Sequence, residues 1–243
     1  STPLLAGSGR SSDKGAMLYD GPPMGDELPR TIAIDGPAAS GKTTVGLAIA
    51  ARYGYSFLDT GLMYRGVTLA ALRAGVPATE EAVRPLLRRL RMTVDVSPAG
   101  TRVSLRGEDV TDALRGPDVE KNVSSYSALP NVRASMVRRQ RAIANRGAAI
   151  LAGRDIGTVV LPKAPLKLYL DASEDARAKR RGTQTTQDAK DARQDISNRD
   201  RVDAARTVSP MKPATDAIVV DTTDMTLDEV IALALEKVAC AES

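Results

Sequence analysis

The chain has 243 residues, of which 42% are hydrophobic and 26% are charged, proportions typical of a globular protein with a sizeable core. The formal net charge is only +4, so the composition gives no sign of a surface that coats nucleic acid. Histidine is absent, which excludes hydrolases built on a Ser–His pair and zinc sites built on histidine. Aromatic residues make up 3%, too few for base recognition mainly by ring stacking.

The first segment of the chain, residues 1–29, is rich in Gly, Ser and Pro and lacks the apolar run of a signal peptide, so we expect a disordered extension there. No stretch approaches the roughly 20 apolar residues that a membrane span needs. The single cysteine, Cys240, rules out an internal disulfide and fits a reducing compartment. These features predict a cytoplasmic protein without a membrane partner.

The first predicted strand, Thr31-Ile32-Ala33-Ile34-Asp35, runs into a glycine-rich turn and then a helix that ends at Gly54. Between strand and helix, backbone N–H groups of such a turn converge on an anion, and the helix dipole adds to the attraction. Lys42 can reach the outer phosphates of a nucleotide, and Thr43 can present its hydroxyl to Mg²⁺. We therefore predict that ATP binds the residues Gly36, Pro37, Ala38, Ala39, Ser40, Gly41, Lys42, Thr43 and Thr44.

Two arginines follow other predicted strands. Arg65 lies on a helix after the strand Ser56-Phe57-Leu58, and Arg154 follows the strand at 148–152. Because the carboxyl ends of parallel strands meet at the ligand-binding edge of such a sheet, both arginines are candidates for a second phosphate-bearing molecule. No Asn-Lys-x-Asp or Asp-x-x-Gly string occurs, which disfavours a regulatory GTPase and favours a kinase.

The remaining pattern predicts an α/β fold, a parallel sheet with helices on both faces. Further strands are expected at 166–170 and 217–220, and Thr226-Leu227-Asp228-Glu229 is a capping box that opens the last helix. A hairpin pattern at 92–96 and 102–105 predicts an inserted small α+β subdomain. We expect core segments at 30–83, 128–173 and 211–243, the inserted subdomain at 84–127 and a helical lid at 174–210.

The predicted lid is polar and carries charges of both signs. Arg177, Arg180 and Arg181 are spaced to share a helical face, and a second basic cluster follows at 199–206. A closing lid would bring arginines onto a transferring phosphoryl group and exclude water, and the simpler alternative is a solvated helix. Phosphoryl transfer needs positioning and charge neutralisation, so the absence of histidine is no obstacle.

Several strings between 30 and 239 together resemble the bacterial cytidylate kinases, nucleoside monophosphate kinases that act on CMP and dCMP. The phosphate loop alone is generic, whereas the Gly-Arg-Asp-Ile-Gly-Thr string joined to Asp-Thr-Gly-x-x-Tyr-Arg is highly specific. The matching strings are Ile34-Asp35-Gly36-Pro37, Leu58-Asp59-Thr60-Gly61-Leu62-Met63-Tyr64-Arg65, Arg138-Arg139-Gln140-Arg141, Gly153-Arg154-Asp155-Ile156-Gly157-Thr158-Val159-Val160-Leu161-Pro162 and Arg199-Asp200-Arg201-Val202-Asp203.

The resemblance implies roles for residues on both sides of the site. Contacts to the cytosine ring are implied for Ser124, Arg133 and Asp155, and contacts to the acceptor phosphate for Arg65, Arg154 and Arg206. Asp203 would contact the sugar hydroxyl, while Thr60 and Tyr64 would line the acceptor pocket. The residues expected to act in catalysis are Lys42, Arg154, Arg199 and Arg206.

One departure from the family pattern concerns the metal. Many relatives carry an acidic residue just before the Gly-Arg-Asp string, where this chain has Ala152, so Thr43 and Asp59 are the remaining Mg²⁺ candidates. The expected partners are ATP, Mg²⁺, CMP and dCMP, with no nucleic acid, and the expected state is a monomer. Two alternatives stay open, a related small-molecule kinase of the uridylate or shikimate type and a nucleotide-dependent nucleic-acid-binding module.

Overall fold

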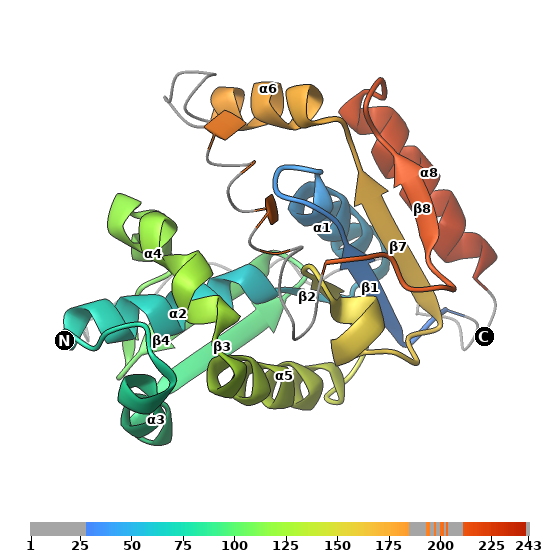
Figure 1. The fold of residues 1–243 in the computed structure, drawn as a ribbon. Coiled ribbons are helices and arrows are strands. Elements are labelled where there is room, and N and C mark those ends of the chain that lie inside the picture. The colour runs from blue at the N-terminus through green and yellow to red at the C-terminus, as the bar shows by residue number, and fades with distance from the viewer. Residues whose placement is uncertain are drawn as a thin grey trace, which may run out of the picture.

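The structure is a computed structural model that describes residues 28–184, 193, 194, 197, 200, 201, 203 and 211–241 (Figure 1). These residues form one eight-stranded sheet in the order β5-β4-β3-β2-β6-β1-β7-β8. Its strands are β1 (Thr31–Asp35), β2 (Ser56–Asp59), β3 (Met92–Ser97), β4 (Gly100–Leu105), β5 (Glu108–Asp109), β6 (Ala149–Ala152), β7 (Leu166–Asp171) and β8 (Ile218–Asp221). The predicted extension at 1–29 lies, except for its last two residues, outside this description.

Five neighbouring strands, β2, β6, β1, β7 and β8, run parallel. In the centre, Ile32 of β1 lies opposite Ile150 of β6 and Leu166 of β7. These central strands are almost entirely apolar because a parallel sheet is covered on both faces. The predicted α/β fold with a parallel sheet is confirmed.

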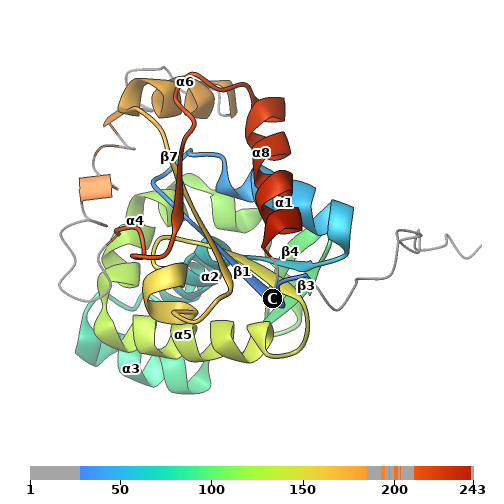
Figure 2. The ribbon, with the colours of Figure 1, turned by 90° about the vertical axis from the view of Figure 1, so that its right-hand side faces the viewer.

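Helices cover both faces of the parallel strands, and each face has its own apolar core. Figure 2 shows α1 and α8 on one side of β1 and β7, with α2 and α5 on the other. The helical segments are α1 (Lys42–Tyr53), α2 (Thr60–Arg73), α3 (Glu80–Arg89), η1 (Ala113–Arg115), α4 (Pro117–Ala128), α5 (Pro130–Ala144), η2 (Ile156–Val160), α6 (Glu174–Gln184) and α8 (Leu227–Cys240). Ile49, Phe57 and Val230 belong to the α1 and α8 side, whereas Met63 and Met136 belong to the other.

The predicted hairpin is confirmed as β3 and β4, which pair along their whole length from Met92 and Leu105 to Ser97 and Gly100. The carboxyl end of β3 joins the parallel strands, because Ser97 pairs with Phe57 of β2. The hairpin therefore extends the main sheet. The division into core, inserted subdomain and lid stays a prediction.

The last helix begins as the sequence predicts. The hydroxyl of Thr226 accepts a hydrogen bond from the amide of Glu229, whose carboxylate accepts one from the amide of Thr226. This reciprocal capping satisfies two amides at the start of α8. Within the described part of the chain, every helix is too short or too polar to cross a membrane.

Candidate functional site

The turn between β1 and α1 needs glycine at two places. Gly36 has a φ of 144°, and a Cβ added there would lie 2.1 Å from the carbonyl oxygen of Leu170 on the neighbouring strand. Gly41 has a φ of 97° and caps the start of α1 in the left-handed conformation. Because L side chains rarely adopt these angles, the glycines allow the loop to turn tightly around an anion at the helix N-terminus.

Lys42 is buried at the first position of α1, with its side chain folded over the loop. Its ammonium donates to the carbonyl of Pro37 at 2.5 Å and to the hydroxyl of Ser40 at 3.3 Å. Burial lowers the pKa of Lys42 well below its ordinary value, and the positive charge of Arg154 lowers it further. A bound anion at this loop would restore the balance in favour of the charged ammonium.

The two candidate metal ligands lie together beside the loop. The hydroxyl of Thr43 donates to Oδ2 of Asp59 at 3.3 Å, while Oδ1 of Asp59 accepts from the amide of Gly61 at 2.9 Å and so caps α2. The neighbouring Thr60 donates to the carbonyl of Ala152 at 2.8 Å. Across the described ranges no group of three or more His, Cys, Asp or Glu residues could hold a metal.

A buried ion pair forms the deepest part of the predicted acceptor side. Arg133 of α5 pairs with Asp155, which follows β6, and only 3% and 6% of their side chains are exposed. The guanidinium of Arg133 also lies 5.4 Å from the centre of the Tyr64 ring on α2. Arg133 thus contacts two residues that are far from it in the sequence, Tyr64 and Asp155.

Two of the arginines that the resemblance assigns to the acceptor phosphate each form an ion pair with a carboxylate. Arg65 pairs with Glu120 of α4 at 2.7 Å, and Nε of Arg154 pairs with Asp203 at 2.9 Å. Ser124 lies half-buried one turn along α4 from Glu120. A guanidinium that pairs with a carboxylate can also pair with a phosphate, so either arginine could bind an anion in place of its carboxylate.

Sequence reasoning missed the role of Asp35, the last residue of β1. Its two carboxylate oxygens accept hydrogen bonds from the amides of Ile156 and Gly157, each at 2.7 Å. Burial raises the pKa of Asp35 to about 6. The carboxylate ties the residue before the phosphate loop to the turn that carries Arg154 and Asp155. Its signal in the sequence is a lone charge at the end of an apolar strand.

Asp200, within the predicted lid, was also missed as a contact of the phosphate loop. Its carboxylate accepts from the amide of Ala38 at 3.1 Å and pairs with Arg177 of α6. Arg180 instead donates to the hydroxyl of Thr222 at 2.9 Å, next to the end of β8. Of the lid arginines expected to act in catalysis, Arg199 and Arg206 lie outside the described residues.

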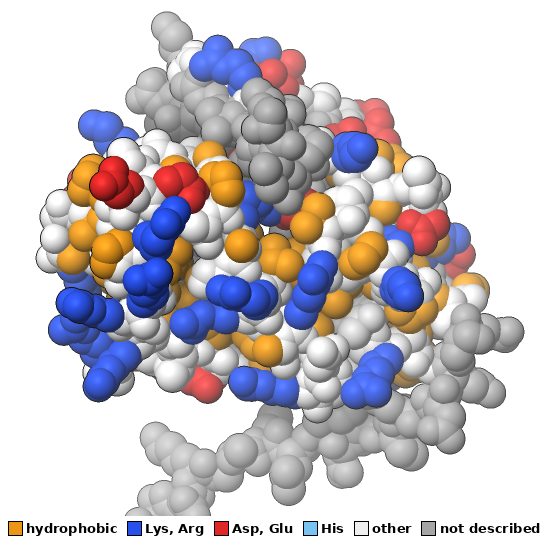
Figure 3. Space-filling view, turned by 60° about the horizontal axis from the view of Figure 1, so that its bottom comes forward, with side chains coloured by type: hydrophobic (Ala, Val, Ile, Leu, Met, Phe, Trp, Pro, Cys, Tyr) orange, Lys and Arg blue, Asp and Glu red, His pale blue; other side chains and the backbone are white. Residues whose placement is uncertain are grey.

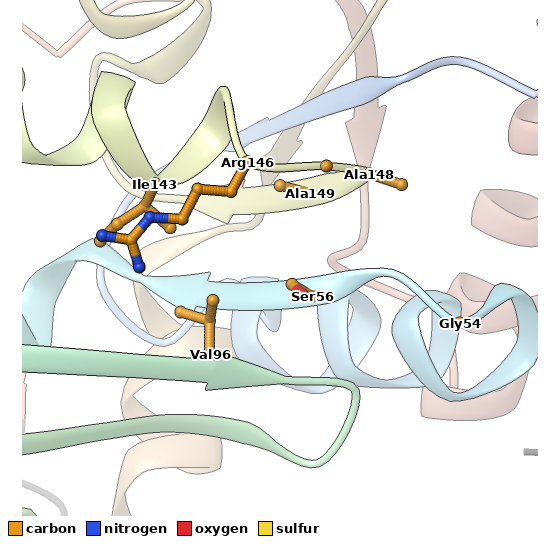
Figure 4. A pocket seen from close by; sticks show the side chains of 8 residues that line it. Gly54, Ser56, Val96, Ile143, Arg146, Ala148 and Ala149 are labelled. Atoms are coloured by element: carbon orange, nitrogen blue, oxygen red, sulfur yellow. The ribbon is translucent and has the colours of Figure 1, made fainter. Parts of the chain in front are cut away.

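A small hollow of about 210 Å³ lies at the amino ends of the parallel strands, away from the phosphate loop. Its lining includes Gly54, Ser56 and Ala149 at the amino ends of β2 and β6, with Arg146 of the chain just after α5. Figure 4 shows the Arg146 side chain extending from the chain after α5 toward the side chain of Ile143. Since Lys42 and Asp155 lie at the carboxyl ends of the strands, this hollow is separate from the candidate site.

A glycine loop between a strand and a helix, a lysine folded over it, and arginines at the neighbouring strand ends define a phosphate-loop phosphotransferase of the α/β class. A sequence profile described as Cytidylate kinase matches residues 32–240. The chain belongs to the cytidylate kinase family, which confirms the resemblance found in the sequence.

Three curated relatives illustrate how much of the chain is shared. The chain is 44% identical to a cytidylate kinase of Nocardia farcinica, over 86% of this chain and 93% of that protein. It is 48% identical to a cytidylate kinase of Mycolicibacterium paratuberculosis, over 82% and 91% of the two chains. It is 45% identical to a cytidylate kinase of Geobacillus thermodenitrificans, over 84% and 94%.

Proposed function

We propose that this protein transfers the γ-phosphoryl group of ATP to CMP or dCMP, forming ADP and CDP or dCDP. An oxygen of the acceptor 5′-phosphate attacks the γ-phosphorus, and the bond from that phosphorus to the β–γ bridging oxygen breaks. The observation that carries the proposal is the buried Arg133–Asp155 pair beside Tyr64. Asp155 and Lys42 both follow the carboxyl ends of central strands. Family membership and the identities to curated cytidylate kinases support it.

The donor half consists of the loop 36–44. The loop amides and Lys42 would hold the ATP phosphates, and the positive end of α1 would favour their charge. Thr43 and Asp59 would hold Mg²⁺, for which a hydroxyl and a carboxylate are fitting oxygen ligands. The metal, when bound, would neutralise charge on the donor phosphates.

The acceptor half would exchange its internal ion pairs for contacts to the substrate. Arg65 and Arg154, joined by Arg206, would release carboxylates and take up the 5′-phosphate. Asp203 would then be available to the sugar hydroxyl. Each guanidinium stays paired with an anion throughout this exchange, because the phosphate takes the place of the carboxylate.

Cytosine would be recognised by Ser124, Arg133 and Asp155. The Asp155 carboxylate accepts hydrogen bonds and can therefore take one from the exocyclic amino group of cytosine, which uracil lacks. A site built to pair a substrate amino group rejects the analogue without it, because buried polar groups are left unpaired. This pairing would favour CMP over UMP.

The proposal also covers the wider organisation of the chain. The segment 84–127 would serve as the monophosphate-binding subdomain and 174–210 as the lid that carries the catalytic Arg199 and Arg206. Asp200 reaching the amide of Ala38 supports a lid that closes on the donor loop. We further propose a monomer that works in the cytoplasm. The free thiol of Cys240 fits the reducing conditions of that compartment.

An acceptor panel tests the proposed reaction. ADP release coupled to a reporter enzyme is measured with CMP, dCMP, UMP, AMP, GMP and shikimate at equal concentrations. CMP and dCMP are expected to give the highest kcat/KM. Turnover confined to a purine monophosphate or to shikimate would refute the cytidine assignment, and UMP as the best acceptor would assign a uridylate kinase.

A further inference from the structure

A second concave site lies at the outer end of the β3–β4 hairpin. A hollow of about 580 Å³ is lined by Arg88, Arg89, Leu90, Arg91 and Arg106. These residues come from the end of α3, the link into β3 and the turn after β4. The hairpin joins β2 at its other end, through Ser97, so the hollow lies far along the strands from that junction.

The arginines of this hollow have no acidic partner among the described residues. Exposed arginines nearby do pair, since Arg73 binds Glu108 at 2.8 Å and Arg102 binds Asp109 at 2.6 Å. These pairs engage both carboxylates of β5, the strand that follows the Arg106 turn. The two acids that follow the Arg106 turn are therefore already paired with other arginines.

The backbone around the hollow is held in place. The amide of Arg106 donates to the carbonyl of Arg91 at 2.8 Å, and Arg106 has a φ of 53°, a left-handed conformation that is unfavourable for a side chain of this kind. From α5, Arg139 donates to the carbonyl of Met92 at 3.0 Å and to that of Leu90 at 3.4 Å. Hydrogen bonds therefore fix the backbone that carries the arginines of the hollow.

The surrounding sequence and surface carry the same excess of positive charge. No Asp or Glu occurs between Glu81 and Asp95, or between Glu120 and Asp155. Figure 3 shows Lys and Arg side chains gathered over the face that α3 and α5 form, with few Asp and Glu side chains among them. The net charge of the whole chain is small because acidic residues elsewhere balance the positive charge of this face.

Helix electrostatics account for part of the cluster. Arg88 and Arg89 lie in the last turn of α3, where cations interact favourably with the helix dipole. Arg91 and Arg106 lie outside any helix and gain nothing from that effect. Their convergence on the same hollow raises mutual repulsion, which a bound anion would relieve.

We propose that this hollow binds a compact oligophosphate, a ligand with several linked phosphate groups. Four of the five lining residues are arginines, whose guanidinium groups can bind phosphate oxygens bidentately, and the volume lies within the roughly 300–1,000 Å³ usual for small-ligand sites. The lining holds no aromatic side chain and a single apolar one, Leu90, so the phosphates are recognised and a base is not. The site is distinct from the phosphate loop and does not depend on the acceptor that the enzyme uses.

The binding test uses inorganic tripolyphosphate in the full chain with Lys42→Ala, which weakens the competing phosphate loop. Isothermal titration calorimetry at two salt concentrations is expected to give one ion per chain. Adding Arg88→Gln, Arg91→Gln and Arg106→Asn should weaken binding at least tenfold. Asparagine suits the left-handed backbone at 106, so the fold should persist. Arg88→Lys keeps the charge and should weaken binding less than Arg88→Gln.

A control replaces the two exposed arginines that pair with the carboxylates of β5, Arg73→Gln with Arg102→Gln, and should leave tripolyphosphate affinity within twofold. An equal loss of affinity in this control would mean that the ion responds to the overall positive charge of the surface, and it would overturn the proposal. No binding at millimolar tripolyphosphate would overturn it as well. A 20-nucleotide RNA that binds several chains and displaces tripolyphosphate at equal phosphate concentration would reassign the face to nucleic acid.

Discussion

Arg133 and Asp155 form an ion pair that is almost fully buried, with the Tyr64 ring beside the guanidinium. The pair joins α5 to the turn after β6, and in the proposed function both residues contact cytosine. Removing one partner of a buried pair leaves the other charge without compensation, which costs about 3–5 kcal/mol. In the proposed function the pair would therefore combine a structural role with recognition of the base.

Asp155→Asn is expected to lower both stability and base discrimination. The amide can no longer compensate Arg133, so the melting temperature should fall. The preference for CMP over UMP in kcat/KM should fall at least tenfold, because the carboxylate acceptor is lost, while KM for ATP stays within about twofold. The exposed pair partner Asp109→Asn serves as control and should change neither. An unchanged CMP preference in a folded Asp155→Asn protein would contradict the assigned contact.

Lys42→Ala is expected to abolish turnover without unfolding the protein. Loss of a charge-stabilising group in phosphoryl transfer lowers kcat by about 100-fold or more. The fold should tolerate the change, since it removes a buried ammonium that bonds only to Pro37 and Ser40 among the described residues. The coupled assay and thermal unfolding measure the two effects, with the exposed Lys163→Ala as control. A variant with near-normal kcat would refute the role of Lys42.

Asp35 predicts a specific pH dependence of stability. Its pKa of about 6 in the folded state exceeds the ordinary value of 3.8, so between these values the folded protein binds more protons than the unfolded one. The contribution of this group to stability is therefore greatest below pH 4 and is lost as the pH rises to about 6. One pKa unit corresponds to about 1.4 kcal/mol.

Denaturant unfolding of the wild type and of Asp35→Asn at pH 4, 5, 6 and 7 measures this dependence. The free energy of unfolding of the wild type, relative to the variant, should decrease from pH 4 to pH 6 and then level off. A difference that stays constant with pH would show that Asp35 does not titrate in this range. Because asparagine offers one acceptor oxygen to two amides, KM for CMP should also rise more than KM for ATP.

Gly36→Ala is expected to destabilise the protein severely. The added methyl group would lie 2.1 Å from the backbone oxygen of Leu170, which cannot move without disturbing β7. Gly75→Ala is the matched control, because Gly75 also has a positive φ, 62°, but open space around its Cβ position. The control should cost about 1–2 kcal/mol from backbone strain alone. Equal losses in thermal unfolding for the two variants would contradict the close packing of Gly36 on β7.

Local patterns in the sequence were sufficient for most elements of the fold. The apolar run before the glycine loop, the alternating hairpin and the Thr226 capping box each depend on neighbouring residues, and each appears in the structure where expected. The contacts of Asp35, Glu120 and Asp200 were missed. The bonds of Asp35 to Ile156, of Glu120 to Arg65 and of Asp200 to Ala38 join residues more than 50 positions apart, and no short string signals such a pairing.

The sequence by itself determined the donor loop, its lysine and the family to which the acceptor strings belong, because those features depend on residue types at short fixed spacing. Only the tertiary structure decided which charges meet. It placed Arg133 against Asp155, tied Asp35 to the turn after Arg154, and gathered Arg91 and Arg106 around one hollow without an acidic partner among the described residues. The physical reason is that charges interact through space, and the distance between two of them is set by packing.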